Sequence, residues 1–125
     1  MNGSDKGIYA VEEGFSKDFY FKNYDSLIQI VQKANPNTAI LFTTNNDSYY
    51  KKEYPNKRVF QAREVMFELT KNKSFAVWDM FEIMGGLNSI KKWETNRLAK
   101  EDLIHLNYKG YNLMADLLFE AIMKS

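Results

Sequence analysis

Residues 38–44 read TAILFTT, a short apolar run that ends in threonines and shows no alternation of apolar and polar positions. Runs of this kind are typical of strands that are buried on both faces of a parallel sheet. A second run, SFAVWDMF at residues 74–81, has the same character. The two runs predict parallel strands near residues 38–44 and 74–81, and therefore an α/β fold.

Helical patterns flank both predicted strands. Residues 57–71 form an amphipathic segment between the strands, and YNLMADLLFEAIMK follows Gly110 as a strongly helical run. A third helix precedes the first strand, with Asp18 as its expected cap and Pro36 as its end, because proline cannot continue the hydrogen-bond ladder. Its apolar face consists of Phe21, Tyr24, Leu27, Ile28 and Val31. Strand, helix and strand in this order predict a right-handed βαβ unit.

Two strands are too few for a sheet of this class. A two-stranded parallel sheet has two open edges and little surface to cover its helices. Either further strands are hidden in the sequence, or the chain belongs to a larger sheet. An exposed edge would also be a surface through which the chain forms a homo-oligomer.

Composition excludes several functional classes. The 125 residues have room for one domain, spanning residues 1–125. Seventeen basic and sixteen acidic residues leave a net charge of +1, which gives no electrostatic footprint for nucleic acid. With no cysteine and one histidine we expect neither a metal nor another cofactor. No apolar stretch is long enough to span a membrane. The sequence does not indicate a cellular compartment.

The single histidine lies in KEDLIHLNYKGY, residues 100–111, three positions after Asp102. In a loop before a helix, the Asp102 carboxylate can reach the Nδ1 atom of His105. That hydrogen bond would fix the tautomer of the ring and leave Nε2 free to take a proton from a hydroxyl nucleophile. The alternative is that both are ordinary surface residues at the start of a helix, since so short a motif also arises by chance.

The setting of this motif resembles the C-terminal part of an SGNH/GDSL-type acyl hydrolase. The resemblance covers about Phe19 to Ile122. It is carried by NPNTAILFTTNND (35–47), VWDMFEIMGGLNSIKKW (77–93) and LAKEDLIHLNYKGYNLMADLLFEAI (98–122). The last motif of that family reads Asp-x-x-His, then Gly-Tyr and a helix, which matches Asp102, His105, Gly110 and Tyr111. The resemblance implies a flavodoxin-like three-layer sandwich and a Ser-His-Asp esterase, with His105 as general base and Asp102 as its orienting partner.

The departures from the family pattern concern the nucleophile and the oxyanion hole, whose family glycine has no counterpart in this sequence. The family's serine lies in a Gly-Asp-Ser-type motif after the first strand, and this sequence has no such motif. None of its serines follows an apolar strand; they are Ser4, Ser16, Ser26, Ser48, Ser74, Ser89 and Ser125. We therefore expect the C-terminal portion of an SGNH hydrolase domain, inactive alone. The nucleophile would come from missing upstream sequence or from another chain.

Two functional hypotheses follow. The first is hydrolysis of small acyl or acetyl esters, including esters of carbohydrates, as the resemblance implies. Asn45, Asn46 and Asp47 follow the first predicted strand, where they would either contact the substrate or serve as turn and cap residues. Tyr49 lies in the loop near the predicted site, where it would line the substrate. Asp79 competes with Asp102 for the role of histidine partner, or else pairs locally. The second hypothesis is a non-catalytic α/β module that binds a ligand or associates with itself.

Overall fold

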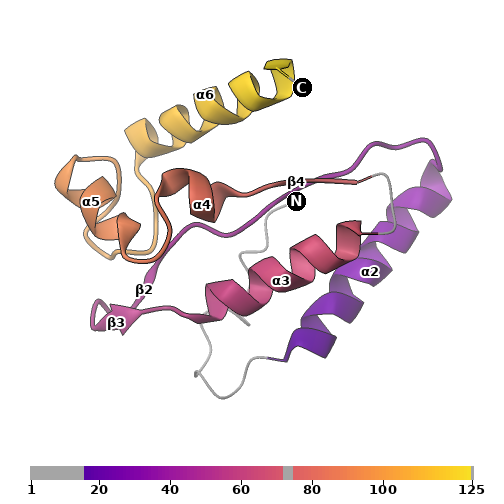
Figure 1. The fold of residues 1–125 in the computed structure, drawn as a ribbon, viewed down its shortest axis with the longest axis horizontal. Coiled ribbons are helices and arrows are strands. Elements are labelled where there is room, and N and C mark those ends of the chain that lie inside the picture. Colours follow the sequence, from indigo (N-terminus) through magenta and orange to yellow (C-terminus); the bar gives the residue numbers. More distant parts are fainter. Residues whose placement is uncertain (1–15, 72–74, 125) are drawn as a thin grey trace. The chain divides into compact units, whose positions relative to one another are not determined.

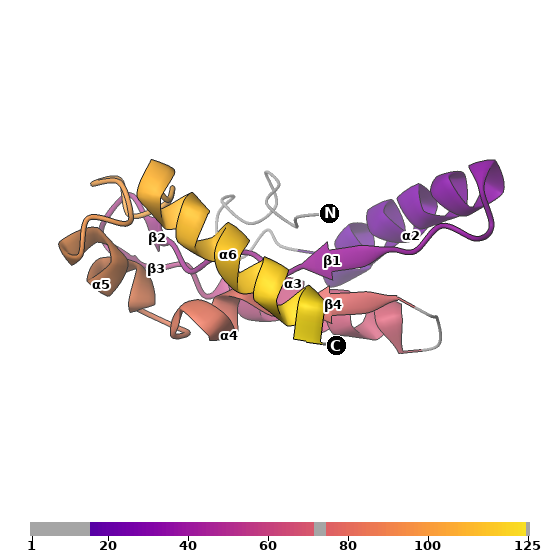
Figure 2. The ribbon, with the colours of Figure 1, turned by 90° about the horizontal axis from the view of Figure 1, so that it is seen from above.

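The computed structural model describes residues 16–71 and 75–124, which form two compact units. The first unit contains residues 16–45, 57–71 and 75–79, and the second contains residues 46–56 and 80–124. Figure 2 labels the helices and strands of both units, and Figure 1 labels all of them except β1. Each unit is described by itself below.

The first unit is built on two parallel strands, β1 (Leu41–Thr43) and β4 (Ala76–Trp78), which run side by side in Figure 2. Phe42 lies beside Val77 in the register. The parallel pair confirms the prediction, but both strands are shorter than the predicted ranges 38–44 and 74–81. Met80 and Phe81 already belong to a helix, and residue 74 lies outside the described residues. Burial on both faces is also wrong for β4, whose Ala76 is exposed.

Helices α2 (Lys17–Ala34) and α3 (Arg58–Thr70) contact each other and pack on the Phe42 side of this sheet. The cap of α2 is Ser16, whose Oγ accepts a hydrogen bond from the Phe19 N–H at 3.2 Å, and not Asp18, which lies in the first turn. The helix ends at Ala34, just before Pro36, as predicted. The buried residues of this core are Tyr20, Ile28, Ile40, Phe42, Ala62, Val65, Met66 and Leu69.

The second unit begins with a hairpin inside the polar stretch that follows β1. Strands β2 (Tyr49–Tyr50) and β3 (Tyr54–Pro55) are antiparallel, and Lys51 and Lys52 turn the chain between them with φ of 50° and 62°. The sequence indicated only a loop here. A two-residue strand is too short to leave a periodic pattern, which explains why the hairpin was not predicted.

Three helices complete the second unit: α4 (Met80–Met84), α5 (Ser89–Thr95) and α6 (Tyr108–Lys124). Gly85 and Gly86, with φ of 120° and 78°, make the turn between α4 and α5, as expected of a glycine pair. In α6 Met114 is buried, while Tyr111 and Ile122 are about half exposed. Within the described residues, no helix is both long and apolar enough to cross a membrane.

Candidate active site

The loop that carries Asp102 and His105 is closed at its base. Ala99 and Leu106 form an isolated antiparallel bridge, and the Lys100 N–H donates to the His105 carbonyl at 2.8 Å. Immediately after the loop, Asn107 precedes α6, and its Oδ1 caps this helix by accepting a hydrogen bond from the Gly110 N–H at 2.9 Å. The motif therefore lies in a tight loop that is fixed between α5 and α6.

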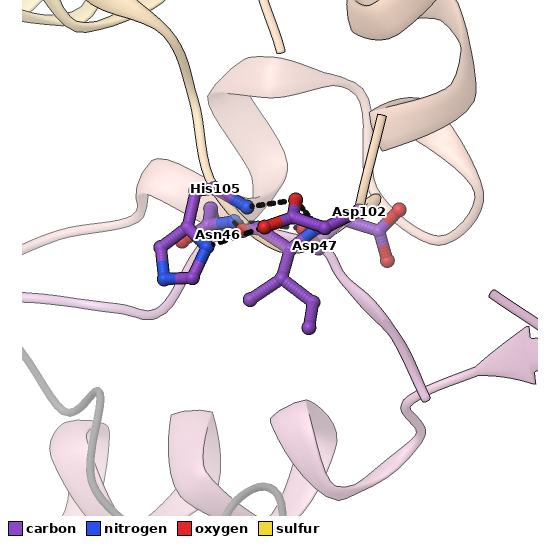
Figure 3. A network of polar contacts seen from close by, with 5 residues as sticks. Asn46, Asp47, Asp102 and His105 are labelled. Atoms are coloured by element: carbon purple, nitrogen blue, oxygen red, sulfur yellow. Dashed lines mark hydrogen bonds and ion pairs between the residues drawn. The ribbon is translucent and has the colours of Figure 1, made fainter. Parts of the chain in front are cut away.

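Within this loop Asp102 reaches His105 in the way the spacing predicts. The Asp102 Oδ2 and His105 Nδ1 atoms are 2.7 Å apart. The second carboxylate oxygen, Oδ1, accepts hydrogen bonds from the N–H groups of Ile104 at 2.8 Å and His105 at 3.0 Å. Figure 3 shows the side chains of Asp102 and His105 in one network with Asn46. One carboxylate thus bonds to both the backbone and the ring of the histidine.

The charge state of Asp102 determines which nitrogen carries the proton. Burial tends to raise the pKa of Asp102, but hydrogen bonds from the His105 ring and from the His105 and Ile104 N–H groups outweigh it, and its pKa lies below the ordinary 3.8. At neutral pH Asp102 is therefore an ionised acceptor, so Nδ1 must be the donor. The neutral ring then has its lone pair on Nε2, which bonds to none of the described residues. The His105 side chain is 59% exposed, so Nε2 is open to a reactant.

The segment that follows β1 also contacts this loop. Asn46 Nδ2 donates to the Ile104 carbonyl at 2.9 Å, and the Tyr49 N–H donates to the Leu103 carbonyl at 2.8 Å. These two bonds join the segment after β1 to the Asp102–His105 loop. The specific bond of Asn46 to Ile104 was not predicted, because no local pattern reports a contact between residues 58 positions apart.

Asp47 is the buried carboxylate of this segment, with no exposed surface. Its Oδ2 accepts from the Ile90 N–H at 3.0 Å, in the first turn of α5, and its own N–H lies 3.1 Å from the Met84 sulfur. Burial raises the pKa of Asp47 from 3.8 to about 6, against the opposing effect of N–H donation from Ile90, Ser48 and Asn88. Among the described residues its Oδ1 finds no partner. Cap duty, one of the two uses predicted for this segment, is what the structure shows for Asp47.

Two other residues predicted to contact substrate are largely enclosed. Asn45 is 2% exposed and belongs to the first unit. Tyr49 is 5% exposed, and its hydroxyl lies 2.5 Å from Asn88 Oδ1. The Lys91 ammonium lies over the Tyr49 ring, 4.9 Å from its centroid. Contact of either residue with substrate stays a prediction.

Asp79, the competing carboxylate, pairs within the first unit. It forms an ion pair with Arg63, and it accepts a hydrogen bond from the Thr44 hydroxyl at 2.9 Å. The local pairing that the sequence analysis named as the alternative is therefore what the structure shows. Asp102 is the carboxylate that contacts the histidine.

The first unit also has a surface hollow of about 490 Å³. Its lining residues are Lys17, Phe60, Arg63, Glu64, Phe67, Glu68 and Lys71. Lys17 pairs with Glu64, while Arg63 pairs with Asp79 and lies over the Phe67 ring. Because these charged side chains pair with one another or with Asp79, and His105 does not line the hollow, we place the candidate chemistry at His105 and not in this hollow.

Comparison with known proteins bears on the fold. No protein-family model matches the chain, and no curated protein sequence matches it significantly. Among solved structures, a peptidoglycan O-acetylesterase aligns with a TM-score of 0.80 at 18% identity, over 98% of this chain and 37% of its own length. The esterase domain of the ZfL2-1 ORF1 protein from a zebrafish retrotransposon aligns with a TM-score of 0.66 at 19% identity, over 88% of this chain and 61% of its own length.

These likenesses define the class of fold. The chain is a mixed α/β structure with parallel strands and flanking helices, similar to the fold of the SGNH-type esterases. This confirms the α/β fold and the resemblance inferred from the sequence. The chain spans less than two thirds of the length of either neighbour.

Proposed function

We propose that this chain supplies the general-base part of a serine-dependent ester hydrolase, with His105 as the base and Asp102 as its orienting partner. The observation that supports the proposal is the 2.7 Å contact between Asp102 Oδ2 and His105 Nδ1, together with an exposed Nε2. A carboxylate that holds an imidazole in this way stabilises the imidazolium that forms during acyl transfer. The fold similarity to two esterases agrees with this chemistry.

The proposed reaction proceeds in two acyl-transfer steps. His105 Nε2 takes the proton of a serine hydroxyl while the serine oxygen attacks the ester carbonyl carbon. Asp102 stabilises the resulting imidazolium, which then donates its proton to the leaving alcohol oxygen as the ester bond breaks. Water, deprotonated by the same Nε2, attacks the acyl-serine carbonyl. The imidazolium returns this proton to the serine oxygen as the acyl–serine bond breaks, which releases the acid and restores the serine hydroxyl.

The nucleophile is proposed to come from another stretch of polypeptide. Of the described serines, Ser16 and Ser26 are exposed on the first unit, while Ser48 and Ser89 are buried. Within residues 16–71 and 75–124, no serine is hydrogen-bonded to His105. Ser4, Ser74 and Ser125 lie outside the described residues. As in the sequence analysis, we expect residues 1–125 to be inactive by themselves.

The proposed substrate is a small acyl ester, and an acetyl ester of a carbohydrate is the first one to test. One structural neighbour, which aligns over 98% of this chain, is a peptidoglycan O-acetylesterase. An exposed base suits a bulky polymeric alcohol, because the ester need not enter a closed cavity. The His105 side chain is 59% exposed, as such access requires.

The test is acetate release from 4-nitrophenyl acetate and from an O-acetylated polysaccharide. Two polypeptides are compared: residues 1–125, and the product of the complete reading frame that contains them. We expect only the longer product to exceed the background rate, and His105→Ala to lower its rate by at least about 10²-fold. Lys109→Ala, in the exposed first turn of α6, is the control that should leave the rate unchanged. Equal rates for wild type and His105→Ala would refute the proposal.

A second candidate function is a non-catalytic module that associates with itself. Exposed apolar side chains on α6 favour it, namely Phe119, Ile122 and Met123, which are 63%, 53% and 67% exposed. In the described part of the chain, β1 and β4 pair only with each other, so each has an open edge. Light scattering over a dilution series tests this candidate. A monodisperse monomer at every concentration would rule it out.

A further inference from the structure

The backbone of Leu103, Ile104 and His105 is fully hydrogen-bonded within the described residues. The Leu103 N–H donates to Lys100, and the N–H groups of Ile104 and His105 donate to Asp102 Oδ1. The three carbonyls accept from Tyr49, from Asn46 and from Lys100, in that order along the chain. Every polar backbone group between Asp102 and Leu106 is therefore held in place.

Four of these six bonds are local, and two come from the 46–49 segment. The two are the Tyr49 N–H to the Leu103 carbonyl and the Asn46 amide to the Ile104 carbonyl. The first is a backbone bond that no side-chain substitution removes. The Asn46 side chain thus forms the side-chain hydrogen bond between the 46–49 segment and the backbone of the Asp102–His105 loop.

The loop requires a hydrogen bond from outside it, because the backbone conformation of Leu103 is strained. Leu103 has a φ of 57°, in the left-handed region that a branched side chain adopts at a cost of about 1–2 kcal/mol. A conformation of this kind persists only where its surroundings fix it. Relaxation of Leu103 would move Ile104 and His105, and with them the ring that meets Asp102.

The 46–49 segment is itself firmly anchored. The buried Asp47 carboxylate bonds to the first turn of α5, and the Ser48 carbonyl accepts from the Asn56 N–H at 2.9 Å. Asn46 directs its two N–H donors to the Asp47 and Ile104 carbonyls, at 2.8 Å and 2.9 Å. An amide has two such donors. Both are occupied, so the Asn46 side chain has no N–H left to donate to a substrate.

We propose that Asn46 is a positioning residue, which holds the Ile104 carbonyl so that His105 Nδ1 stays within bonding distance of Asp102. This assignment rests on the proposed function, because a fixed imidazole matters only if His105 is the base. Asn46 acts through the loop backbone, and the readout is therefore the Asp102–His105 bond rather than overall stability.

The experiment measures the pKa of Asp102 by carboxyl carbon NMR titration in folded protein. In wild type this pKa lies below 3.8 because of the His105 ring and the loop N–H groups. Asn46→Ala removes the donor, and Asn46→Leu removes it while keeping the branched outline of the side chain. Both should raise the Asp102 pKa toward 3.8. Asn96→Ala is the matched control, since it also loses an amide bond to a backbone carbonyl, that of Lys92, and should leave this pKa unchanged.

His105→Ala separates the two proposals. If it raises the Asp102 pKa but both Asn46 variants match wild type, the positioning role is refuted and the proposed base remains. If His105→Ala leaves the Asp102 pKa unchanged, the ring does not bond to Asp102, and the proposed function fails together with the positioning role. Global unfolding of both Asn46 variants would also overturn the inference, because Asn46 would then be needed for the fold as a whole.

Discussion

Asp47→Asn should change how the unfolding free energy of the protein depends on pH. The substitution keeps the shape of the side chain and an oxygen that can accept from the Ile90 N–H, but it removes a charge that has no exposed surface. Burial raises the pKa of Asp47 from 3.8 to about 6. A difference of about two pKa units corresponds to about 3 kcal/mol of unfolding free energy.

The sign follows from which state binds the proton more tightly. The folded state does, since its pKa is the higher one. The contribution of Asp47 to stability is therefore complete below pH 3.8 and is lost as the pH rises through about 6. Asp102 acts in the opposite direction, because its pKa is lowered and its contribution is lost as the pH falls. The comparison of wild type with Asp47→Asn cancels the effect of Asp102.

The assay is urea unfolding of both proteins, followed by circular dichroism at several pH values. We expect the stability of Asp47→Asn relative to wild type to increase by about 3 kcal/mol between about pH 3 and pH 7. Asp116→Asn, which removes an exposed carboxylate from α6, is the surface control. If the stability difference for Asp47→Asn changes with pH no more than that of this control, the reasoning is refuted, because the buried carboxylate would then carry no desolvation penalty.

Two further predictions concern the loop and the helix after it. Asp102→Asn should lower the rate of ester hydrolysis by the complete reading-frame product by about 10²- to 10⁴-fold. Asp79→Asn, which removes the ion-pair partner of Arg63, should keep most of the rate. Equal losses in the two variants would contradict the assignment of Asp102 as the partner of His105. Gly110→Ala should lower the unfolding free energy by at least about 2 kcal/mol, because its Cβ would lie 1.9 Å from the Leu98 carbonyl oxygen. Lys109→Ala is the exposed control for the same urea titration, and a Gly110→Ala protein as stable as this control would contradict the packing.

The sequence predicted the elements that leave a periodic or compositional pattern. The two apolar runs located β1 and β4, and helical spacing located α2, α3 and α6. The boundary between β4 and α4 was not predictable, because Met80 and Phe81 suit a buried strand as well as a helix. The hairpin at residues 49–55 was missed because tertiary contacts, such as the Tyr49 N–H bond to Leu103, stabilise strands that are too short to be recognised.

In the candidate site, too, local contacts were predictable from the sequence and distant contacts were not. Asp102 and His105 are three residues apart, so their contact is local and the motif alone suggests it. The bond from Asn46 to Ile104 joins residues 58 positions apart, and the sequence could place Asn46 near the site without giving its role. The sequence predicts Tyr49 near the substrate site, but its burial depends on the unpredicted hairpin and on the Asn88 side chain.

The central claim is that Asp102 keeps the proton of a neutral His105 on Nδ1. The single histidine makes this directly measurable by nitrogen NMR of the imidazole ring at a pH where the ring is neutral. We predict a proton on Nδ1 and a lone pair on Nε2 in wild type, with loss of this preference in Asp102→Asn. A wild-type ring with its proton on Nε2 would contradict the account, because that nitrogen could then accept no proton from a nucleophile.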